Sequence, residues 1–128
     1  MPEEMDRLWS LRLTRRARTD IEAAHVSLAE NAGLVIADAW QEGLEAVIAS
    51  LSHLPQRCSA AQEADLFPAP LVRQLIYRRS RSSPAYRILF RLHDNPDDAP
   101  FVRLIALRHG AQAPLTADEA QVLHDEDE

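Results

Sequence analysis

The chain has 128 residues, of which 46% are hydrophobic and 27% charged, the size and composition of a single soluble domain. No apolar run approaches the roughly 18 residues that cross a bilayer, and the acidic start MPEEMD differs from the basic start of a secretory signal. We therefore predict a cytoplasmic protein without membrane contact. Cys58 is the only cysteine, and the histidines show no metal-ligand spacing, so the sequence predicts neither a disulfide nor a metal site, and no cofactor.

The net charge of −6 is distributed in blocks along the chain. Residues 71–109 carry eight arginines against three aspartates, whereas residues 1–70 carry six arginines against eleven acids. The residues from 110 onward carry six acids and no base, and there is no lysine anywhere. Because guanidinium matches carboxylate and phosphate in forked geometry, a basic segment between two acidic ones indicates a binding partner.

The first half of the chain predicts one strand and two helices. Residues 9–13 alternate between apolar and polar side chains, which is typical of a strand with one buried face. Thr14 can cap a helix that ends near residues 31–33, and an apolar stripe from Ile36 to Leu54 predicts a second, longer helix that Pro55 stops. About three residues join the two, so we expect an antiparallel helical hairpin.

The second half predicts three strands, at residues 71–77, 86–93 and 101–109, separated by the turns SRSSP and DNPDDAP. Thr116 stands three residues before Glu119, the capping-box pattern of a short helix, and the sequence HDEDE after it should be solvated.

These elements predict an α+β fold with one N-terminal strand, an antiparallel helical hairpin, a three-stranded antiparallel meander and a short C-terminal helix. We expect an antiparallel sheet with the helices on one face. The predicted organisation is a flexible N-terminus at 1–8, a domain at 9–114, and a short helix with an acidic tail at 115–128.

A register can be assumed for the last two strands by placing His93 opposite Phe101. This pairing puts Arg91 opposite Arg103 and Arg87 opposite Leu107, and because side chains alternate between the faces of a strand, it also sorts the residues onto two faces. One face is apolar except for Arg108 and should lie under the helices. We expect the other, arginine-bearing face to be open to solvent or to a partner.

On that open face, Arg87 would lie diagonally across from His109. An arginine beside a histidine can bind a phosphate and transfer a proton, which is the chemistry of a nuclease. The alternative is that these arginines only keep an open sheet face soluble, and that His109 is structural.

The stretches LRLTRRARTDIEAAHVSLAEN and VRQLIYRR…YRILFRL…VRLIALRHG, with a second helix ending LSHLP, resemble the ParE branch of the ParE/RelE superfamily of bacterial toxins. Proteins of this kind are often labelled plasmid stabilisation proteins, and the resemblance runs from Leu11 to Pro114. It implies the strand, helix, helix, meander order. It also implies a toxin that inhibits DNA gyrase by protein–protein binding, that a ParD-like antitoxin neutralises, and that forms a homodimer or a toxin–antitoxin hetero-oligomer.

The resemblance also suggests roles for individual residues. Antitoxins of this family wrap an acidic segment around the toxin, and the predicted partner-binding residues are the arginines of the last two strands, Arg87, Arg91, Arg103 and Arg108. The acidic tail, residues 118–128, offers a second occupant, because it can fold back over these strands as a shield or else extend into solvent.

Two alternatives to a gyrase inhibitor stay open at this stage. In RNA-cleaving relatives, positions near Arg87 and His109 serve phosphate binding and proton transfer, so a ribosome-associated mRNA endonuclease would use these two as catalytic residues. The absence of lysine argues against it, as do Ala111 and Gln112 where the family has arginines. A third alternative is a non-toxic binding module on the same fold.

Overall fold

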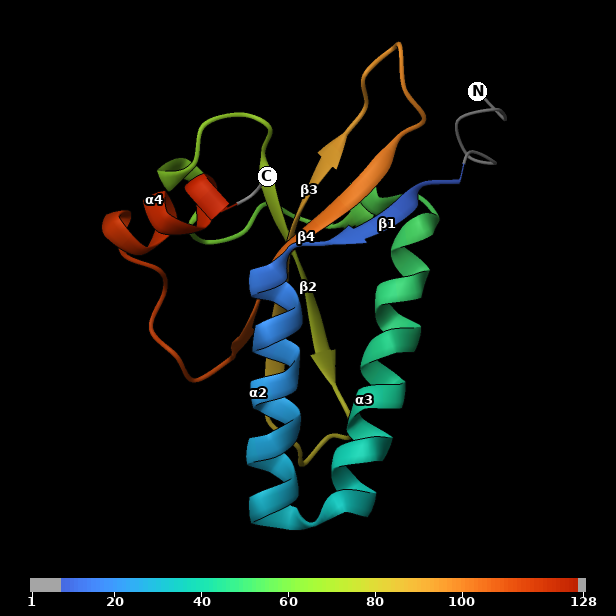
Figure 1. Cartoon of the computed structure of the whole chain (residues 1–128), viewed down its shortest axis with the longest axis vertical. Helices are drawn as coiled ribbons and strands as arrows, with labels where there is room; N and C mark the ends of the chain where they lie inside the picture. The colour runs from blue at the N-terminus through green and yellow to red at the C-terminus, as the bar shows by residue number, and fades with distance from the viewer. Residues whose placement is uncertain (1–7, 127–128) are drawn as a thin grey trace.

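The computed structural model describes residues 8–126, which form a four-stranded mixed sheet and three α-helices (Figure 1). In chain order the elements are β1 (Ser10–Leu13), α2 (Arg15–Ala32), α3 (Leu34–Ala49), β2 (Val72–Arg78), β3 (Ala85–His93), β4 (Phe101–His109) and α4 (Ala117–Glu126). This order confirms the predicted α+β fold. The N-terminus predicted to be flexible lies outside the described residues, apart from Leu8, and within those residues no helix has the length and apolarity to span a membrane.

Helices α2 and α3 form the predicted antiparallel hairpin, seen as two neighbouring columns in Figure 1. Thr14 caps α2, since its hydroxyl accepts a hydrogen bond from the Ala17 backbone at 3.1 Å. Gly33, with φ of 95°, is the only residue between the helices, so the predicted three-residue connection is too long.

Helix α3 ends at Ala49, five residues before the predicted end, and continues as a 3-10 turn over Ser50–Ser52. The hydroxyls of Ser50 and Ser52 donate to the carbonyls of Val47 and Ala49, at 2.6 and 3.0 Å. Serine side chains that bond to nearby backbone in this way compete with helix propagation, which accounts for the early end.

The sheet has the order β1-β4-β3-β2. We expected an antiparallel sheet, but β1 pairs with β4 in the parallel direction, so the sheet is mixed. Strand β1 pairs with Phe101 to Leu104, so within residues 8–126 the second half of β4 has no neighbouring strand on that side. The N-cap and first turns of α2 take the place of a strand at this edge. The Thr14 hydroxyl donates to the Ile105 carbonyl at 3.4 Å, and Asp20 accepts from the Leu107 N–H at 3.0 Å.

A β-bulge interrupts the β3–β4 hairpin where β1 stops pairing. From His93 opposite Phe101 to Phe90 opposite Leu104 the register is the predicted one, but Leu89 lies opposite Ala106. Ile105 is therefore the extra residue, and every later residue of β4 changes faces relative to the prediction. Arg87 consequently pairs with Arg108 instead of Leu107, and Tyr86 pairs with His109.

The main core lies between the helical hairpin and one face of the sheet. Its side chains come from β1, both helices and alternate positions of the strands, with Trp40, Leu44 and Phe90 at most 2% exposed. Tyr77 belongs to this core and donates its hydroxyl to the Trp40 carbonyl at 2.8 Å. The predicted apolar face under the helices is confirmed as far as Leu104. Beyond the bulge the prediction is wrong, because Leu107 lies on this face in place of Ala106, and Arg108 lies on the opposite face together with Arg87.

The opposite face of the sheet carries a second, smaller core. Leu89, Ile105 and Ala106 pack there against side chains of the loop 59–70 and of the C-terminal segment, including Phe67, Leu115, Ala120 and Leu123. The expectation of an open second face is therefore wrong. Apolar residues fall on both faces of the central strands, so both faces need cover to remove them from water.

Helix α3 lies close to the sheet at Gly43, where a Cβ would collide with the Tyr77 hydroxyl. We expect Gly43→Ala to lower the free energy of unfolding by about 1–3 kcal/mol, the usual cost of overpacking a core. In a Tyr77→Phe background, which removes the colliding oxygen, the same substitution should cost much less. Urea unfolding of the two single variants, the double variant and the parent gives the coupling energy; equal costs in both backgrounds would contradict the contact.

Candidate functional site

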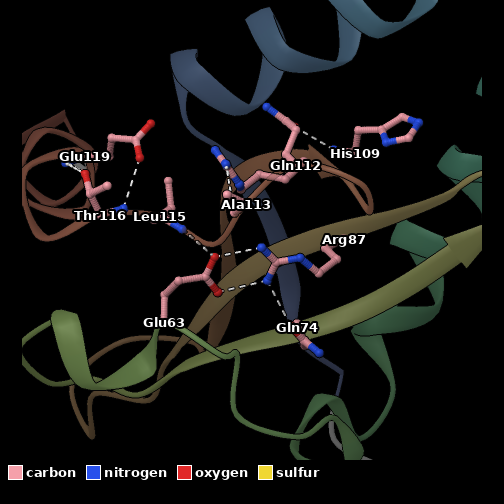
Figure 2. A network of polar contacts seen from close by, with 10 residues as sticks. Glu63, Gln74, Arg87, His109, Gln112, Ala113, Leu115, Thr116 and Glu119 are labelled. Carbon is pink, nitrogen blue, oxygen red and sulfur yellow. Dashed lines mark hydrogen bonds and ion pairs between the residues drawn. The ribbon is translucent and has the colours of Figure 1, made fainter.

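The best-defined polar site in the molecule is a buried ion pair between Arg87 on β3 and Glu63 in the loop before β2 (Figure 2). Its geometry is two-pronged, with Nη1 to Oε1 at 2.8 Å and Nη2 to Oε2 at 2.7 Å. Nη1 also donates to Gln74 Oε1 at 3.1 Å, and Glu63 Oε2 accepts from the Leu115 N–H at 3.0 Å. One carboxylate thus joins the loop, the sheet and the C-terminal segment.

Both partners of this pair are removed from water, since Glu63 is 2% and Arg87 5% exposed. The hydrogen bonds from Arg87 lower the pKa of Glu63 from 4.5 to about 2, although burial acts in the opposite direction. The same hydrogen bonds raise the pKa of Arg87. The pair therefore stays charged at neutral pH and serves as an internal fastening, with neither group poised to exchange a proton.

Two more of the predicted partner-binding arginines are buried on the same face of the sheet. Arg91 is 3% exposed, lies 3.2 Å from His124 Nδ1 of α4, and has its guanidinium carbon 5.1 Å from the centre of the Phe67 ring. Arg108 is 8% exposed and donates to the Ala113 carbonyl at 2.7 Å. These contacts bury the side chains within the chain itself, so their predicted role in binding a partner stays a prediction.

Arg103 is the exception among the four, because its side chain is only partly buried. It lies at the end of the sheet near the 94–100 turn, with its guanidinium carbon 5.3 Å from the centre of the Phe101 ring. The exposed Arg12 of β1 contacts the same ring at 3.8 Å, and His93 stacks on it at 4.7 Å with the ring planes 4° apart. We call Arg12, His93, Phe101 and Arg103 the aromatic–basic cluster.

His109 lies on the other face of the sheet from Arg87, because the bulge moves it to the helix side. Its Nδ1 accepts from the Ala111 N–H at 3.0 Å, and its ring meets Tyr86 edge-on at 5.1 Å. Figure 2 shows Arg87 turned toward Glu63 and the His109 ring directed away from both. The predicted placement of Arg87 and His109 on one face is therefore wrong.

A cavity of about 290 Å³ opens beside His109, between α2 and the end of β4. Arg16, Asp20, Tyr86 and Gln112 contribute to its wall, and Arg87 does not. Arg16 is already paired with Asp20 at 3.0 Å, and Gln112 accepts from the His109 N–H at 2.8 Å. Burial raises the pKa of Tyr86, which keeps the phenol protonated. The lining groups thus largely satisfy one another.

Sequence reasoning missed Glu63 and His124, which hold the second face closed. Glu63 sits in a loop with little periodicity, so nothing in its neighbourhood signals a buried carboxylate. The sequence does indicate that the second face of the sheet is buried, because ILF in β3 and LIAL in β4 are continuous apolar runs. Such runs are typical of strands buried on both faces. Among residues 8–126 no group of metal-ligating side chains comes together.

Comparisons with known proteins agree with the geometry. The family model described as "ParE toxin of type II toxin-antitoxin system, parDE" matches residues 11–114, which confirms the resemblance found in the sequence. A solved structure titled "Chromosomal ParDE TA system from P. aeruginosa" contains a chain with a TM-score of 0.58 and 17% identity to this one. The match covers 80% of this chain and 96% of that one, and at this identity it supports the fold. No curated protein matches the sequence.

Removing the buried carboxylate should be costly. We expect Glu63→Gln to lower the free energy of unfolding by about 3 kcal/mol, because it leaves the Arg87 charge buried without its counter-ion. Asp65→Asn, an exposed neutralisation in the same loop, is the matched control and should change stability by less than about 0.5 kcal/mol. Chemical unfolding at neutral pH measures both; a small effect of Glu63→Gln would contradict a fastening role.

The same pair predicts how stability depends on pH. A carboxylate whose pKa falls from 4.5 to about 2 on folding contributes stability above pH 4.5 and loses it as pH falls toward 2. The stability difference between the parent and Glu63→Gln should therefore be constant above about pH 5 and shrink steadily below it. Unfolding curves measured between pH 7 and pH 3 test this; a difference independent of pH would rule out the ionised pair as its source.

Proposed function

This chain belongs to the ParE toxin family of type II toxin–antitoxin systems, and from that premise we propose that it inhibits DNA gyrase by binding it. We propose further that a cognate ParD-like antitoxin neutralises it in the cytoplasm, as part of a plasmid-stabilisation system. The observation that carries the proposal is the separation of Arg87 and His109 by the sheet. A toxin that acts by protein–protein binding does not need Arg87 and His109 side by side. The alternative mRNA endonuclease does, because it would use them together as catalytic residues.

The polar contacts of the two residues support binding over cleavage. Both terminal nitrogens of Arg87 bond to Glu63, so phosphate would have to compete with a buried carboxylate for them. Nδ1 of His109 accepts a backbone N–H, which leaves Nε2 as the protonated nitrogen of the neutral ring. A general base and a phosphate-binding group are thus not presented to one reacting atom.

We propose that partners first meet the accessible basic side chains. Arg103 and Arg12 of the aromatic–basic cluster fit this role, because both guanidinium groups lie within 5.3 Å of one ring centre and Arg12 is exposed. Two cations held close together attract a carboxylate-bearing partner and gain by its approach. Arg87, Arg91 and Arg108 belong to the proposed partner surface only where the C-terminal segment is displaced.

The first test is to induce the chain alone in bacteria and pulse-label DNA and protein synthesis. We expect DNA synthesis to fall within minutes and translation to follow later, because loss of gyrase activity stops replication before it starves ribosomes of mRNA. An uninduced culture is the control. Early collapse of translation would instead point to the mRNA endonuclease, and unimpaired growth to a binding module without toxicity.

A second test addresses the contact surface with purified gyrase. Arg103→Ser should raise the concentration needed to inhibit supercoiling by about tenfold, the effect of roughly 1.4 kcal/mol lost from an interface. Arg18→Ser, an exposed arginine on the outer part of α2, is the control and should leave inhibition unchanged. Equal inhibition by both variants would remove the aromatic–basic cluster from the gyrase interface.

A further inference from the structure

The C-terminal segment Gly110–Glu126 covers the arginine-bearing face, and most of it lies beyond the family match, which ends at residue 114. Its helix α4 buries only Ala120 and Leu123, which pack with Leu89, Ile105 and Ala106 of the central strands. Figure 1 shows α4 beside the sheet, near the N-terminal end of α2 and away from α3. The segment is therefore an addition to the sheet and the hairpin, laid over a surface that they leave apolar.

The remainder of the fold does not depend on this addition. The core under the helical hairpin draws its buried side chains from residues 9–107, and none of them comes from the C-terminal segment. The segment contributes only to the second core, where its side chains are Leu115, Ala120 and Leu123. Because the two cores lie on opposite faces of the sheet, the segment can open while the main core stays packed.

Besides the Gly110 N–H bond to the Ala85 carbonyl, polar contacts join the segment to the sheet, to the loop before β2 and to α2. The Leu115 N–H donates to Glu63, Arg108 donates to the Ala113 carbonyl, and Arg91 meets His124. Glu126 lies 3.8 Å from Arg16, at the long end of ion-pair distance and largely in solvent. Glu63 is the strongest of these attachments, because one of its oxygens serves Arg87 and the segment together.

The charges of the segment do not match the surface that it covers. Its carboxylates at Asp118, Glu119, Asp125 and Glu126 are all exposed. Arg108, nine-tenths buried, donates a hydrogen bond to the Ala113 carbonyl, and within the described residues its Nε has no hydrogen-bond partner. Hydrogen bonds with Thr116 lower the pKa of the fully exposed Glu119, and the charge of Arg108 contributes to this, but no hydrogen bond joins the side chains of Arg108 and Glu119. A buried guanidinium that is hydrogen-bonded to no carboxylate is costly, so the closed state gives up free energy that an acidic occupant of this face would recover.

We propose that Gly110–Glu126 is an intramolecular cover, which opens as a unit without unfolding the domain and which, while closed, keeps the arginine-bearing face from the toxin's target. Opening frees Arg91 and Arg108 together with the apolar side chains beneath them. The proposal rests on the proposed function in one respect, since the face that it blocks is part of the proposed partner surface. The opening itself is a property of the isolated chain.

Two adjacent residues of α4 give a matched test. Leu123 is 3% exposed and packs on the sheet, whereas Val122 is 51% exposed. Leu123→Asp places a charge in the closed interface and should detach α4, whereas Val122→Asp places the same charge in solvent. Leu123→Ala is a milder opening variant, for use where the aspartate variant fails to accumulate.

Opening is measured on the full-length purified proteins. In Leu123→Ala, hydrogen exchange of the amides in 110–126 should accelerate at least about 30-fold relative to the parent, while the amides of α2, α3 and β4 keep their protection. Leu123→Asp should bind the anionic apolar dye 8-anilinonaphthalene-1-sulfonate more strongly than Val122→Asp. Loss of protection throughout the chain, or unchanged protection in 110–126, would overturn the cover.

The inhibitory role is measured by the pulse-labelling experiment on cells. Leu123→Asp should suppress DNA synthesis at lower expression than the parent, and Val122→Asp should match the parent. If the segment opens but suppression is unchanged or weaker, the cover does not restrain the toxin and the inhibitory role is wrong. If no variant suppresses DNA synthesis, the gyrase proposal and the inhibitory role fail, while exchange and dye binding still decide whether the segment opens.

Discussion

The two-pronged bond between Arg87 and Glu63 is the interaction on which the second face of this molecule depends. It brings a loop, the central sheet and the C-terminal segment to one buried carboxylate. Without this pair, one charged side chain would be buried against the apolar strands without a counter-ion. The segment after β4 would also lose the hydrogen bond between the Leu115 N–H and Glu63. Burial of apolar side chains provides most of the contact between these three segments. The ion pair determines which segments pack together, because a buried charge tolerates few alternative partners.

One inserted residue decides what the site can do. Ile105 shifts the register between Leu89 and Phe90, so Arg87 faces Glu63 while His109 turns to the helix side. The bulge sits where β1 ends and where Thr14 and Asp20 take over the free edge of β4. A strand that loses its neighbour can twist more freely, and bulges concentrate at such edges. The arrangement of the N-terminal strand and helix thus controls the chemistry of side chains about 90 positions later.

The sequence predicted the fold well wherever one periodic signal dominated. Alternation in residues 9–13, the Thr14 cap and the capping box at Thr116 and Glu119 all have the structures expected of them. The register failed halfway along the hairpin, because one extra residue in a continuous apolar run leaves no trace in hydrophobicity. The parallel pairing of β1 and the burial of Glu63 also escaped, since both depend on contacts between segments far apart in the chain. The C-terminal helix continues to Glu126, and His124 is half-buried beside Arg91, although Asp125 and Glu126 are exposed as the sequence predicted.

The burial of three arginines changes the meaning of the charge blocks. Residues 71–109 look strongly basic, yet Arg87, Arg91 and Arg108 contribute little to the field outside the closed chain, because each is at most 8% exposed. Among the arginines of residues 71–109, the exposed ones are Arg78, Arg79 and Arg81 at the β2–β3 turn, and Arg103 of the aromatic–basic cluster is partly exposed. A partner attracted over a distance would therefore respond to these groups first. Only an occupant that replaces α4 and brings carboxylates could use the remaining arginines, and it would gain more from each of them because the apolar strands around them exclude water.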